Sequence, residues 1–308
     1  MNKSFAVIDI GSLKAKFEIK SFDKFNNSKT IYKDVIRANL LKDLDKNGGF
    51  IIKQSILDTI NAVENFKLKM KEFNVYNFES ITTEAFRKAK NGTEVLERIE
   101  QETGIRLRII TGKEEGQLLF NSISPDFKDE TIAVVDVGGG SVQVIIGRNN
   151  EIFNTYYFQT GTAVKYIIHK DSRHPTIEES NKSLDWIREQ LKPLLDNKYE
   201  ITYLIYGSTC VIDFFKAMDF PRVKIKNKTH KFYVDISSIR DLYYKLLPLS
   251  IEERFSFYPE DPYYMWGADK AFMNILTVSE YLNVDKIVPT NNNIATGILN
   301  ELALNNTL

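Results

Sequence analysis

The stretch VVDVGGGSVQVIIG, from Val134 to Gly147, places an aspartate and three consecutive glycines between two runs rich in β-branched residues. The apolar runs predict two short buried strands joined by a tight turn, with Asp136 where the first strand ends. Gly138 to Gly140 have no Cβ atom, so they can adopt positive φ angles and let successive N–H groups converge on one point. An isolated triple glycine is as often a flexible hairpin turn, and the flanking strands favour an anion site here. A carboxylate beside such a site suggests a bridging metal ion.

The same pattern occurs near the start of the chain. FAVIDIGS, residues 5–12, aligns without a gap with IAVVDVGG, residues 132–139, so that Asp9 falls on Asp136. Each copy continues through a second strand-like run into a third, at residues 30–36 and 151–158. Helical periodicity follows in both copies, most clearly over residues 53–70. Weaker helical patterns cover residues 94–102, 179–195, 236–247, 268–282 and 296–304.

The repeat predicts an α/β fold with two similar lobes, and 308 residues are enough for two domains of ordinary size. A polar segment with a proline, residues 124–131, separates the two copies. We therefore expect a first lobe over residues 1–130 and a second over residues 131–294. Such lobes would place their two turns across a phosphate-binding cleft, the arrangement of the actin-like (ribonuclease-H-like) ATPase fold. Kinases, chaperones, filament proteins and phosphatases share this fold, so it does not settle the function.

Composition limits the partners and the cellular compartment. Lysine plus arginine and aspartate plus glutamate are equal at 41 each, so no global field attracts DNA, RNA or an anionic membrane. The one cysteine, Cys210, fits a reducing compartment. The first apolar run ends at Asp9 and is too short for a signal-peptide core, and no run is long enough to span a bilayer. We expect a cytoplasmic protein without nucleic-acid or membrane partners.

Two further motifs lie between the glycine turns: TTEAFRKAKNG, residues 82–92, and TGKEEGQLLF, residues 111–120. With DIGS at residues 9–12 and DVGGGS at residues 136–141, they resemble the exopolyphosphatase and guanosine pentaphosphate phosphohydrolase family, in which four such motifs occur in this order. The resemblance continues more weakly through GTAV, residues 161–164, and LSIEERF, residues 249–255. It implies the short two-domain form without a C-terminal helical domain, a homodimer, and a last helix, residues 295–308, that packs back on the first lobe.

The resemblance also implies roles for individual residues. Glu115 matches the glutamate that activates the attacking water, although taken alone it would more often be a helix-start carboxylate. Hydrolysis of a terminal phosphoryl group needs such a base, an in-line water, and donors or a metal that absorb charge. The expected magnesium ligands are Asp9, Asp136 and Gln143. The expected phosphate-binding residues are Gly11, Ser12, Arg87, Gly138, Gly139, Gly140 and Ser141.

The chain departs from the family pattern at several of these motifs. Leu13 and Lys14 replace an asparagine and a serine, Gln143 replaces a glutamate, and Ser208 replaces a glycine. These changes leave open a non-catalytic descendant that binds a phosphate-rich ligand. The fold alone would also allow an ATP-dependent small-molecule kinase, for which GSTC, residues 207–210, is a poor adenosine-binding turn. The substrate of a hydrolase, polyphosphate or guanosine pentaphosphate, is not distinguished by the motifs.

Basic and histidine residues outside the motifs allow further interpretations. Three lysines alternate along a possible strand: Lys224, Lys226 and Lys228. Their side chains could form a ladder that binds along a polyphosphate chain, although such lysines more often protect the exposed edge of a sheet. Other lysines could add positive potential near the expected cleft or form a solvated face: Lys88, Lys90 and Lys165. The histidines have no zinc-site spacing: His169, His174 and His230.

Overall fold

The computed structural model describes residues 2–12, 14–25, 27–40, 44, 46–164, 176–207 and 211–306, without the side chain of residue 263. Several residues named above lie outside these ranges: Leu13, Lys165, His169, His174, Ser208 and Cys210. The chain divides into two compact units. Unit 1 comprises Met1–Ser122 and Ile294–Leu308, and unit 2 comprises Ile123–Asn293. Each unit has its own sheet and its own core.

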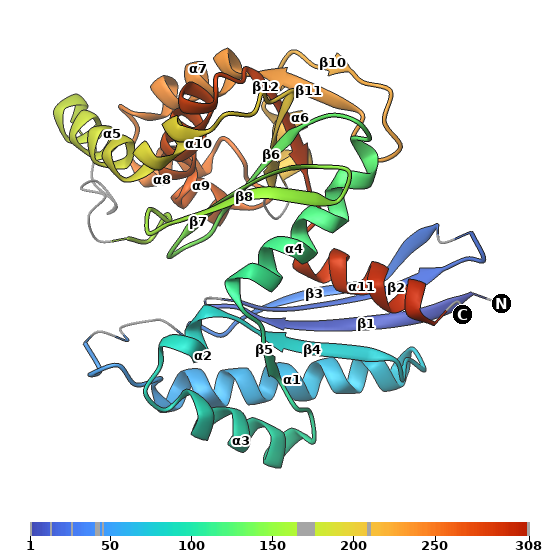
Figure 1. Ribbon diagram of the computed structural model, residues 1–308. Coiled ribbons are helices and arrows are strands. Elements are labelled where there is room, and N and C mark those ends of the chain that lie inside the picture. Colours follow the sequence, from blue (N-terminus) through green and yellow to red (C-terminus); the bar gives the residue numbers. More distant parts are fainter. Residues whose placement is uncertain are drawn as a thin grey trace. The chain divides into compact units, whose positions relative to one another are not determined.

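Unit 1 contains a five-stranded mixed sheet in the order β3-β2-β1-β4-β5 (Figure 1). β1 (Lys3–Ile10), β2 (Lys14–Phe22) and β3 (Ser28–Arg37) are successive antiparallel strands, and β4 (Phe78–Thr82) and β5 (Arg108–Ile109) extend the sheet in parallel. The helices of unit 1 are α1 (Lys53–Glu72), α2 (Glu84–Lys88), α3 (Gly92–Thr103), α4 (Gly112–Ile123), whose last residue belongs to unit 2, and α11 (Ile294–Asn305).

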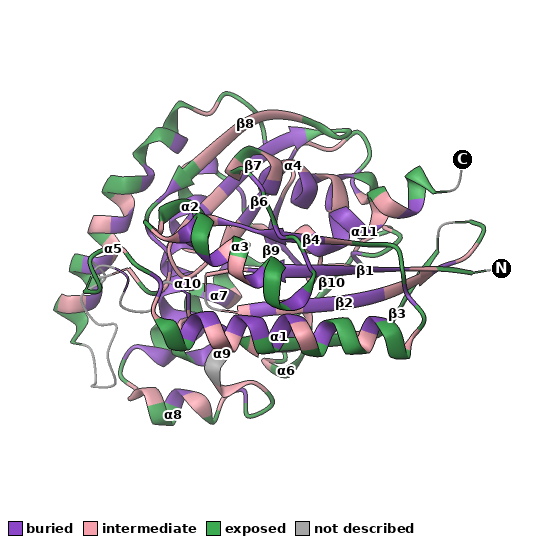
Figure 2. Cartoon of the chain, turned by 90° about the horizontal axis from the view of Figure 1, so that it is seen from below, coloured by how far each residue is buried: buried purple, intermediate pink, exposed green. Residues whose placement is uncertain are grey.

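Strand β1 is the centre of unit 1 because it is buried on both faces (Figure 2). Alternate side chains of a strand point to opposite faces. Ala6, Ile8 and Ile10 therefore enter one apolar cluster with α1 and α3, whereas Phe5 and Val7 enter another with Leu118 of α4 and with α11. A Cβ atom at Gly297 of α11 would overlap the carbonyl oxygen of Leu118, so this glycine lets the two helices approach closely.

Unit 2 contains a seven-stranded mixed sheet in the order β10-β11-β12-β9-β6-β7-β8. β6 (Ile132–Val137), β7 (Val142–Arg148) and β8 (Glu151–Phe158) are antiparallel neighbours, and β9 (Tyr203–Gly207) and β12 (Lys286–Thr290) run parallel to β6. β10 (Val223–Lys224) and β11 (Phe232–Asp235) form the other edge. The helices are η1 (Ser124–Asp126), α5 (Ile177–Leu191), η2 (Lys192–Asp196), α6 (Val211–Ala217), α7 (Ile236–Leu246), α8 (Ile251–Phe255), α9 (Pro262–Trp266) and α10 (Ala268–Leu282).

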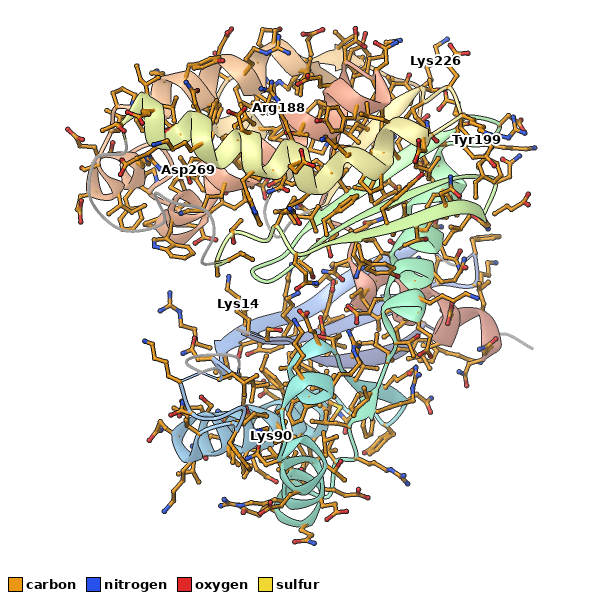
Figure 3. The ribbon with its side chains drawn as sticks, turned by 60° about the vertical axis from the view of Figure 1, so that its left-hand side comes forward. Lys14, Lys90, Arg188, Tyr199, Lys226 and Asp269 are labelled. Atoms are coloured by element: carbon orange, nitrogen blue, oxygen red, sulfur yellow. The ribbon has the colours of Figure 1, made fainter. Side chains whose placement is uncertain are left out.

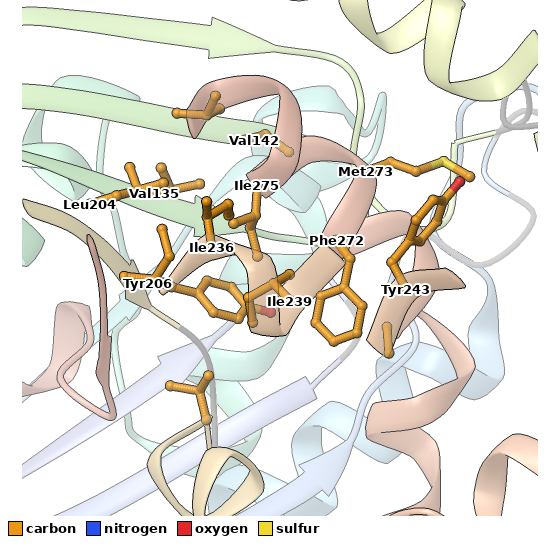
Figure 4. Packing of buried hydrophobic residues seen from close by; sticks show 14 of the residues in the cluster. Val135, Val142, Leu204, Tyr206, Ile236, Ile239, Tyr243, Phe272, Met273 and Ile275 are labelled. Carbon is orange, nitrogen blue, oxygen red and sulfur yellow. The ribbon is translucent and has the colours of Figure 1, made fainter. Parts of the chain in front are cut away.

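The core of unit 2 forms where helices α7 and α10 pack on this sheet (Figure 4). Side chains of β6 and β9, among them Val135 and Leu204, meet Ile239 of α7 and Phe272 and Ile275 of α10. Most of α10 is buried, which explains why its apolar residues are not confined to one stripe. These contacts hold the carboxyl ends of β6, β9 and β12 in one rigid layer.

The α/β fold class and the repeated three-strand opening are confirmed, since β1-β2-β3 and β6-β7-β8 have the same antiparallel order.

The prediction of one helix over residues 179–195 was too long. α5 ends at Leu191 and a 3-10 turn containing Pro193 follows, because proline lacks the N–H that an α-helix interior needs. The possible strand that was expected to carry Lys224, Lys226 and Lys228 was also too long, because β10 ends at Lys224 and residues 225–231 form a loop. No helix in the described ranges has the length and apolar character needed to cross a lipid bilayer.

The segment 124–131, which the sequence suggested as a boundary, belongs to unit 2, which begins at Ile123, and is hydrogen-bonded within it. The Ser124 hydroxyl donates to the side chain of Asn150. The amide of Asp129 donates to Oδ1 of Asn149 at 2.8 Å, and Nδ2 of Asn149 returns a bond to Oδ1 of Asp129 at 3.1 Å. These bonds fix the start of β6 to the turn between β7 and β8.

Candidate active site

The β1–β2 hairpin of unit 1 carries Asp9, Gly11 and Ser12. The N–H of Gly11 donates to the carbonyl of Lys14 at 2.9 Å and closes the turn. The Thr82 hydroxyl, at the end of β4, donates to the carbonyl of Ile10 at 2.8 Å and holds the end of β1 in place. Thr82 is fully buried, so the first residue of the threonine-containing motif is an anchor for the neighbouring turn.

The β6–β7 hairpin of unit 2 repeats this geometry. The N–H of Gly138 donates to the carbonyl of Ser141 at 2.9 Å, at the positions that align with Gly11 and Lys14. In the register of the two strands, Asp136 lies opposite Gln143. The sequence repeat therefore extends to the hydrogen bond that closes each turn.

The explanation of the three glycines by positive φ angles was wrong. Among the described glycines, positive φ occurs at Gly48, Gly49 and Gly104 and not in this turn. The turn is instead constrained by close packing against residues 161–163. A Cβ atom at Gly161 would lie 2.5 Å from the carbonyl oxygen of Gly139 and from backbone atoms of Gly140 and Ser141. A side chain at Gly161 would therefore separate two backbones that are in contact.

The segment 161–163 also fixes the direction of the peptide groups in the glycine turn. Its three N–H groups donate to the three carbonyls of the turn. The donor–acceptor distances are 3.4 Å from Gly161 to Gly140, 3.0 Å from Thr162 to Gly138 and 2.8 Å from Ala163 to Gly139. No described residue accepts a bond from the N–H groups of Gly139 and Gly140. The turn therefore presents unused donors, which is the property expected of an anion cradle.

The two glutamates at the start of α4 have different tasks. The backbone amide of Glu114 donates to the Thr111 hydroxyl at 3.2 Å, and the Glu114 carboxylate accepts a hydrogen bond from the Thr111 amide at 2.9 Å. This reciprocal pair is a capping box. Hydrogen bonds from the Thr111 amide and from Arg108 lower the pKa of Glu114. Glu115 is thus not needed as the helix-start carboxylate.

Glu115 is instead joined to Arg87 of α2. Nη1 of Arg87 lies 2.9 Å from Oε1 of Glu115 and also donates to the carbonyl of Ile110. The Glu115 side chain is 11% exposed and that of Arg87 is 32% exposed, so the arginine has the greater contact with solvent. Nε and Nη2 of Arg87 have no acceptor among the described residues. The guanidinium can orient the carboxylate and still offer a fork of donors to an anion.

The remaining residues of the motif at 82–92 support α2. The side chain of Asn91 exchanges two hydrogen bonds with the backbone of Ile51, at 2.9 and 3.1 Å. A Cβ atom at Gly92 would overlap the carbonyl oxygen of Phe86. The asparagine and glycine therefore hold the chain after α2, which keeps Arg87 directed at the start of α4.

The expected magnesium ligands lie on the two hairpins, Asp9 on β1 and Asp136 and Gln143 on β6 and β7. Within the described ranges no three histidine, cysteine, aspartate or glutamate residues gather closely enough to hold a metal ion. Asp9 is almost fully buried and lies 3.5 Å from Nζ of Lys16, its partner across the β1–β2 ladder. Asp136 and Gln143 supply two oxygen donors opposite each other, and Mg²⁺ commonly completes such a partial shell with water and phosphate oxygens.

Three residues of this site were absent from the sequence-based assignment of roles: Lys16, Thr82 and Gly161. A signal for Lys16 was present, because the alignment of the two repeats matches Lys16 to Gln143, and these residues are the cross-strand partners of Asp9 and Asp136. The roles of Thr82 and Gly161 depend on contacts with residues 72 and 22 positions away. No local pattern contains those contacts.

The chain has two α/β units, each opened by an aspartate-containing hairpin with the same closing hydrogen bond, which is the architecture of the actin-like fold. The model of the Ppx/GppA phosphatase family matches residues 24–236, more than half of the chain, and the protein belongs to this family. The matched range includes Arg87, Glu115 and the glycine turn, whereas Asp9 and Ser12 precede it.

Individual relatives are distant. A bifunctional 3-dehydroquinate synthase/phosphatase from Fusobacterium nucleatum is 26% identical over 246 residues, covering 73% of this chain and 37% of that protein. A guanosine-5'-triphosphate,3'-diphosphate pyrophosphatase from Aliivibrio fischeri is 24% identical over 213 residues, covering 68% of this chain and 41% of that protein. The chain thus spans about two fifths of the length of these curated relatives.

The structure of this chain matches the crystal structure of an exopolyphosphatase from Cytophaga hutchinsonii with a TM-score of 0.83. The two sequences are 21% identical and the match covers 98% of both chains, which shows the shared fold.

Proposed function

We propose that this protein hydrolyses the terminal phosphoanhydride bond of inorganic polyphosphate or of guanosine pentaphosphate. The family and the names of its relatives support a phosphatase acting on one of these compounds. Water attacks the terminal phosphorus, the bond to the bridging oxygen breaks, and the products are orthophosphate and a substrate shorter by one phosphate.

The observation that carries the proposal is the ion pair between Arg87 and Glu115. Glu115 is the general base that accepts a proton from the attacking water, and the 2.9 Å contact with Arg87 fixes its orientation. The neighbouring Glu114 already caps α4, so Glu115 has no competing task at the helix start. The free donors of Arg87 bind an oxygen of the terminal phosphoryl group.

The glycine turn binds the phosphate chain. The N–H groups of Gly139 and Gly140 and the hydroxyl of Ser141 donate to phosphate oxygens, and Gly11 and Ser12 of the first hairpin do the same. Glu115 belongs to unit 1 and the glycine turn to unit 2, so the proposal assigns functional residues to both units.

Magnesium is part of the proposal. Asp136 and Gln143 are the residues that would hold it, and the ion would supply positive charge to phosphate oxygens when bound. Lys16 already supplies a cation beside Asp9, so Asp9 holds an ammonium group and is a weaker candidate for a metal ligand.

The test is release of orthophosphate from long-chain polyphosphate and, separately, from guanosine pentaphosphate. Glu115→Gln should lower the rate by roughly 10²- to 10⁴-fold, the usual contribution of a general base. Glu114→Gln is the matched control, because glutamine at the same position still completes a capping box, and its rate should stay near that of the wild type. Chelation of Mg²⁺ should abolish release by the wild type.

Equal losses in the two variants would remove Glu115 from the role of base. If the wild type binds either compound but releases no phosphate from it, the protein is a binding descendant of the family and the proposed reaction is wrong. The faster of the two reactions identifies the substrate.

A further inference from the structure

The most basic stretch of unit 2 comprises β10, the residues just before it and the loop that joins it to β11. Residues 220–231, here called the basic hairpin, contain no aspartate or glutamate. Its five cationic side chains are all in exposed positions: Arg222, Lys224, Lys226, Lys228 and Lys231. Lys226 projects outward at one extremity of the unit (Figure 3). Because the whole chain has no net charge, this concentration is local.

The cations of the basic hairpin have no carboxylate partners among the described residues. Elsewhere in unit 2, exposed lysines such as Lys182 and Lys192 form ion pairs with glutamates at 2.6 Å. In the hairpin, Arg222 lies over the ring of Phe232 at 5.9 Å, and the ammonium group of Lys231 donates to the carbonyl of Asn227. Neither contact neutralises charge, so the hairpin attracts anions.

The loop is also held firmly to the rest of unit 2. The buried carboxylate of Asp126 accepts the backbone N–H groups of Lys228, Thr229 and His230, at 2.7 to 3.0 Å. Nδ1 of His230 lies 2.9 Å from the same carboxylate, and its Nε2 lies 2.8 Å from the hydroxyl of Thr290 on β12. An anion that binds the lysines therefore meets a backbone that is already ordered, which lowers the entropic cost of binding.

Protection of a sheet edge does not explain this number of charges. Lysines on an edge strand prevent pairing with another chain, and the need for them grows with the length of the exposed edge. β10 is only two residues long, and three of the five cations lie beyond it in sequence.

We propose that the basic hairpin binds a segment of a polyphosphate chain away from its reacting end. This inference rests on the proposed function and makes long-chain polyphosphate, rather than guanosine pentaphosphate, the substrate class. A linear polyphosphate carries charge along its whole length and can occupy a second site while its terminus reacts, whereas a nucleotide ends at its base and ribose. Closely spaced phosphates also gain from counterion release when several lysines bind them.

The experiment compares two triple variants with the same change in net charge. One is Lys224→Gln, Lys226→Gln and Lys228→Gln in the basic hairpin. The control is Lys71→Gln, Lys182→Gln and Lys198→Gln, which are exposed at other places on the chain. Binding of long-chain polyphosphate, tripolyphosphate and single-stranded RNA is measured in EDTA, so that the result does not depend on hydrolysis, and folding is checked by thermal unfolding.

We expect the hairpin variant to bind long-chain polyphosphate on the order of tenfold more weakly, with the salt slope of log K smaller in magnitude by about 2 for three lost contacts. Binding and hydrolysis of tripolyphosphate should not change.

Unchanged affinity for long chains, or an equal loss in the control, would overturn the proposal. A loss confined to RNA would overturn it in favour of an RNA surface. Absence of hydrolysis by the wild type would contradict the proposed function alone, because the binding comparison is made without turnover.

Discussion

At the scale of single residues, the site depends on pairs of neighbours with separate tasks. Glu114 and Glu115 are adjacent in sequence, yet one completes a capping box and the other contacts Arg87. Successive helix residues are about 100° apart around the axis, so adjacent side chains meet different surroundings. A carboxylate pair at a helix start can therefore stabilise the helix and supply a reactive group at once.

Gly161 is the residue at which packing and binding are most closely coupled. Gly161→Ala should weaken tripolyphosphate binding by roughly tenfold or more, because a Cβ atom 2.5 Å from the glycine turn must displace the N–H groups that we propose bind phosphate. Titration calorimetry gives the affinity, and thermal unfolding gives the accompanying loss of stability.

Gly104→Ala is the control for lost stability. Gly104 has a φ angle of 71° and nothing within 4 Å of an added Cβ atom, so alanine there strains only the backbone, by about 1 kcal/mol. Its tripolyphosphate affinity should equal that of the wild type. An unchanged affinity in Gly161→Ala would show that the turn is not the phosphate cradle.

At the scale of elements, the loop between β10 and β11 is tied to η1 by one carboxylate. Burial by itself would raise the pKa of Asp126, but hydrogen bonds from the His230 side chain and from the His230 and Thr229 amides outweigh it and lower the pKa from 3.8 to about 2. The folded protein therefore binds fewer protons here than the unfolded chain between these two values.

This difference predicts an acid-dependent stability. The contribution of Asp126 is complete above pH 4, and it is lost as the pH falls towards 2. Asp126→Asn should remove on the order of 1 kcal/mol of this pH-dependent stability and flatten the curve between these limits. Both tryptophans, Trp186 and Trp266, belong to unit 2, so their fluorescence during urea unfolding reports on it. The exposed Asp213, as Asp213→Asn, is the control, and a wild-type slope in Asp126→Asn would refute the assignment.

At the scale of the whole molecule, the chain leaves unit 1 after Ser122 and returns to it at Ile294. The returning helix α11 buries Ile298 and Leu299 against the β1 side chains Phe5 and Val7. A discontinuous unit of this kind is complete only when both ends of the chain are present.

Removal of residues 294–308 should therefore destabilise unit 1 selectively. Loss of two buried aliphatic side chains alone would cost about 3–6 kcal/mol. Hydrogen exchange measured by mass spectrometry should show faster exchange in β1 and α4, while β9 and β12 of unit 2 keep their protection. Removal of residues 306–308 leaves α11 intact and is the control. Uniform loss of protection in both units would mean that they do not unfold separately.

Features that depend on near neighbours were determined by the sequence alone. The two aspartate hairpins and the three-strand openings follow from alternation, turn residues and spacing over a few positions, and they were sufficient for the fold class. The order of the four motifs resembled that of a known family, and that resemblance was sufficient for the family. The same local register pairs Asp136 with Gln143. Such features can be read locally because strands joined by tight turns pair with the next segment of chain.

The tertiary structure alone decided which distant groups meet. It joins Arg87 to Glu115 across 28 positions, places residues 161–163 behind the glycine turn, and attaches His230 to Asp126 across 104 positions. It also showed that the three glycines do not adopt positive φ angles and that Gly161 must lack a side chain to let the two backbones meet. These contacts are made when helices and loops pack on a finished sheet, and the packing depends on shape and burial over the whole unit, which no local spacing encodes.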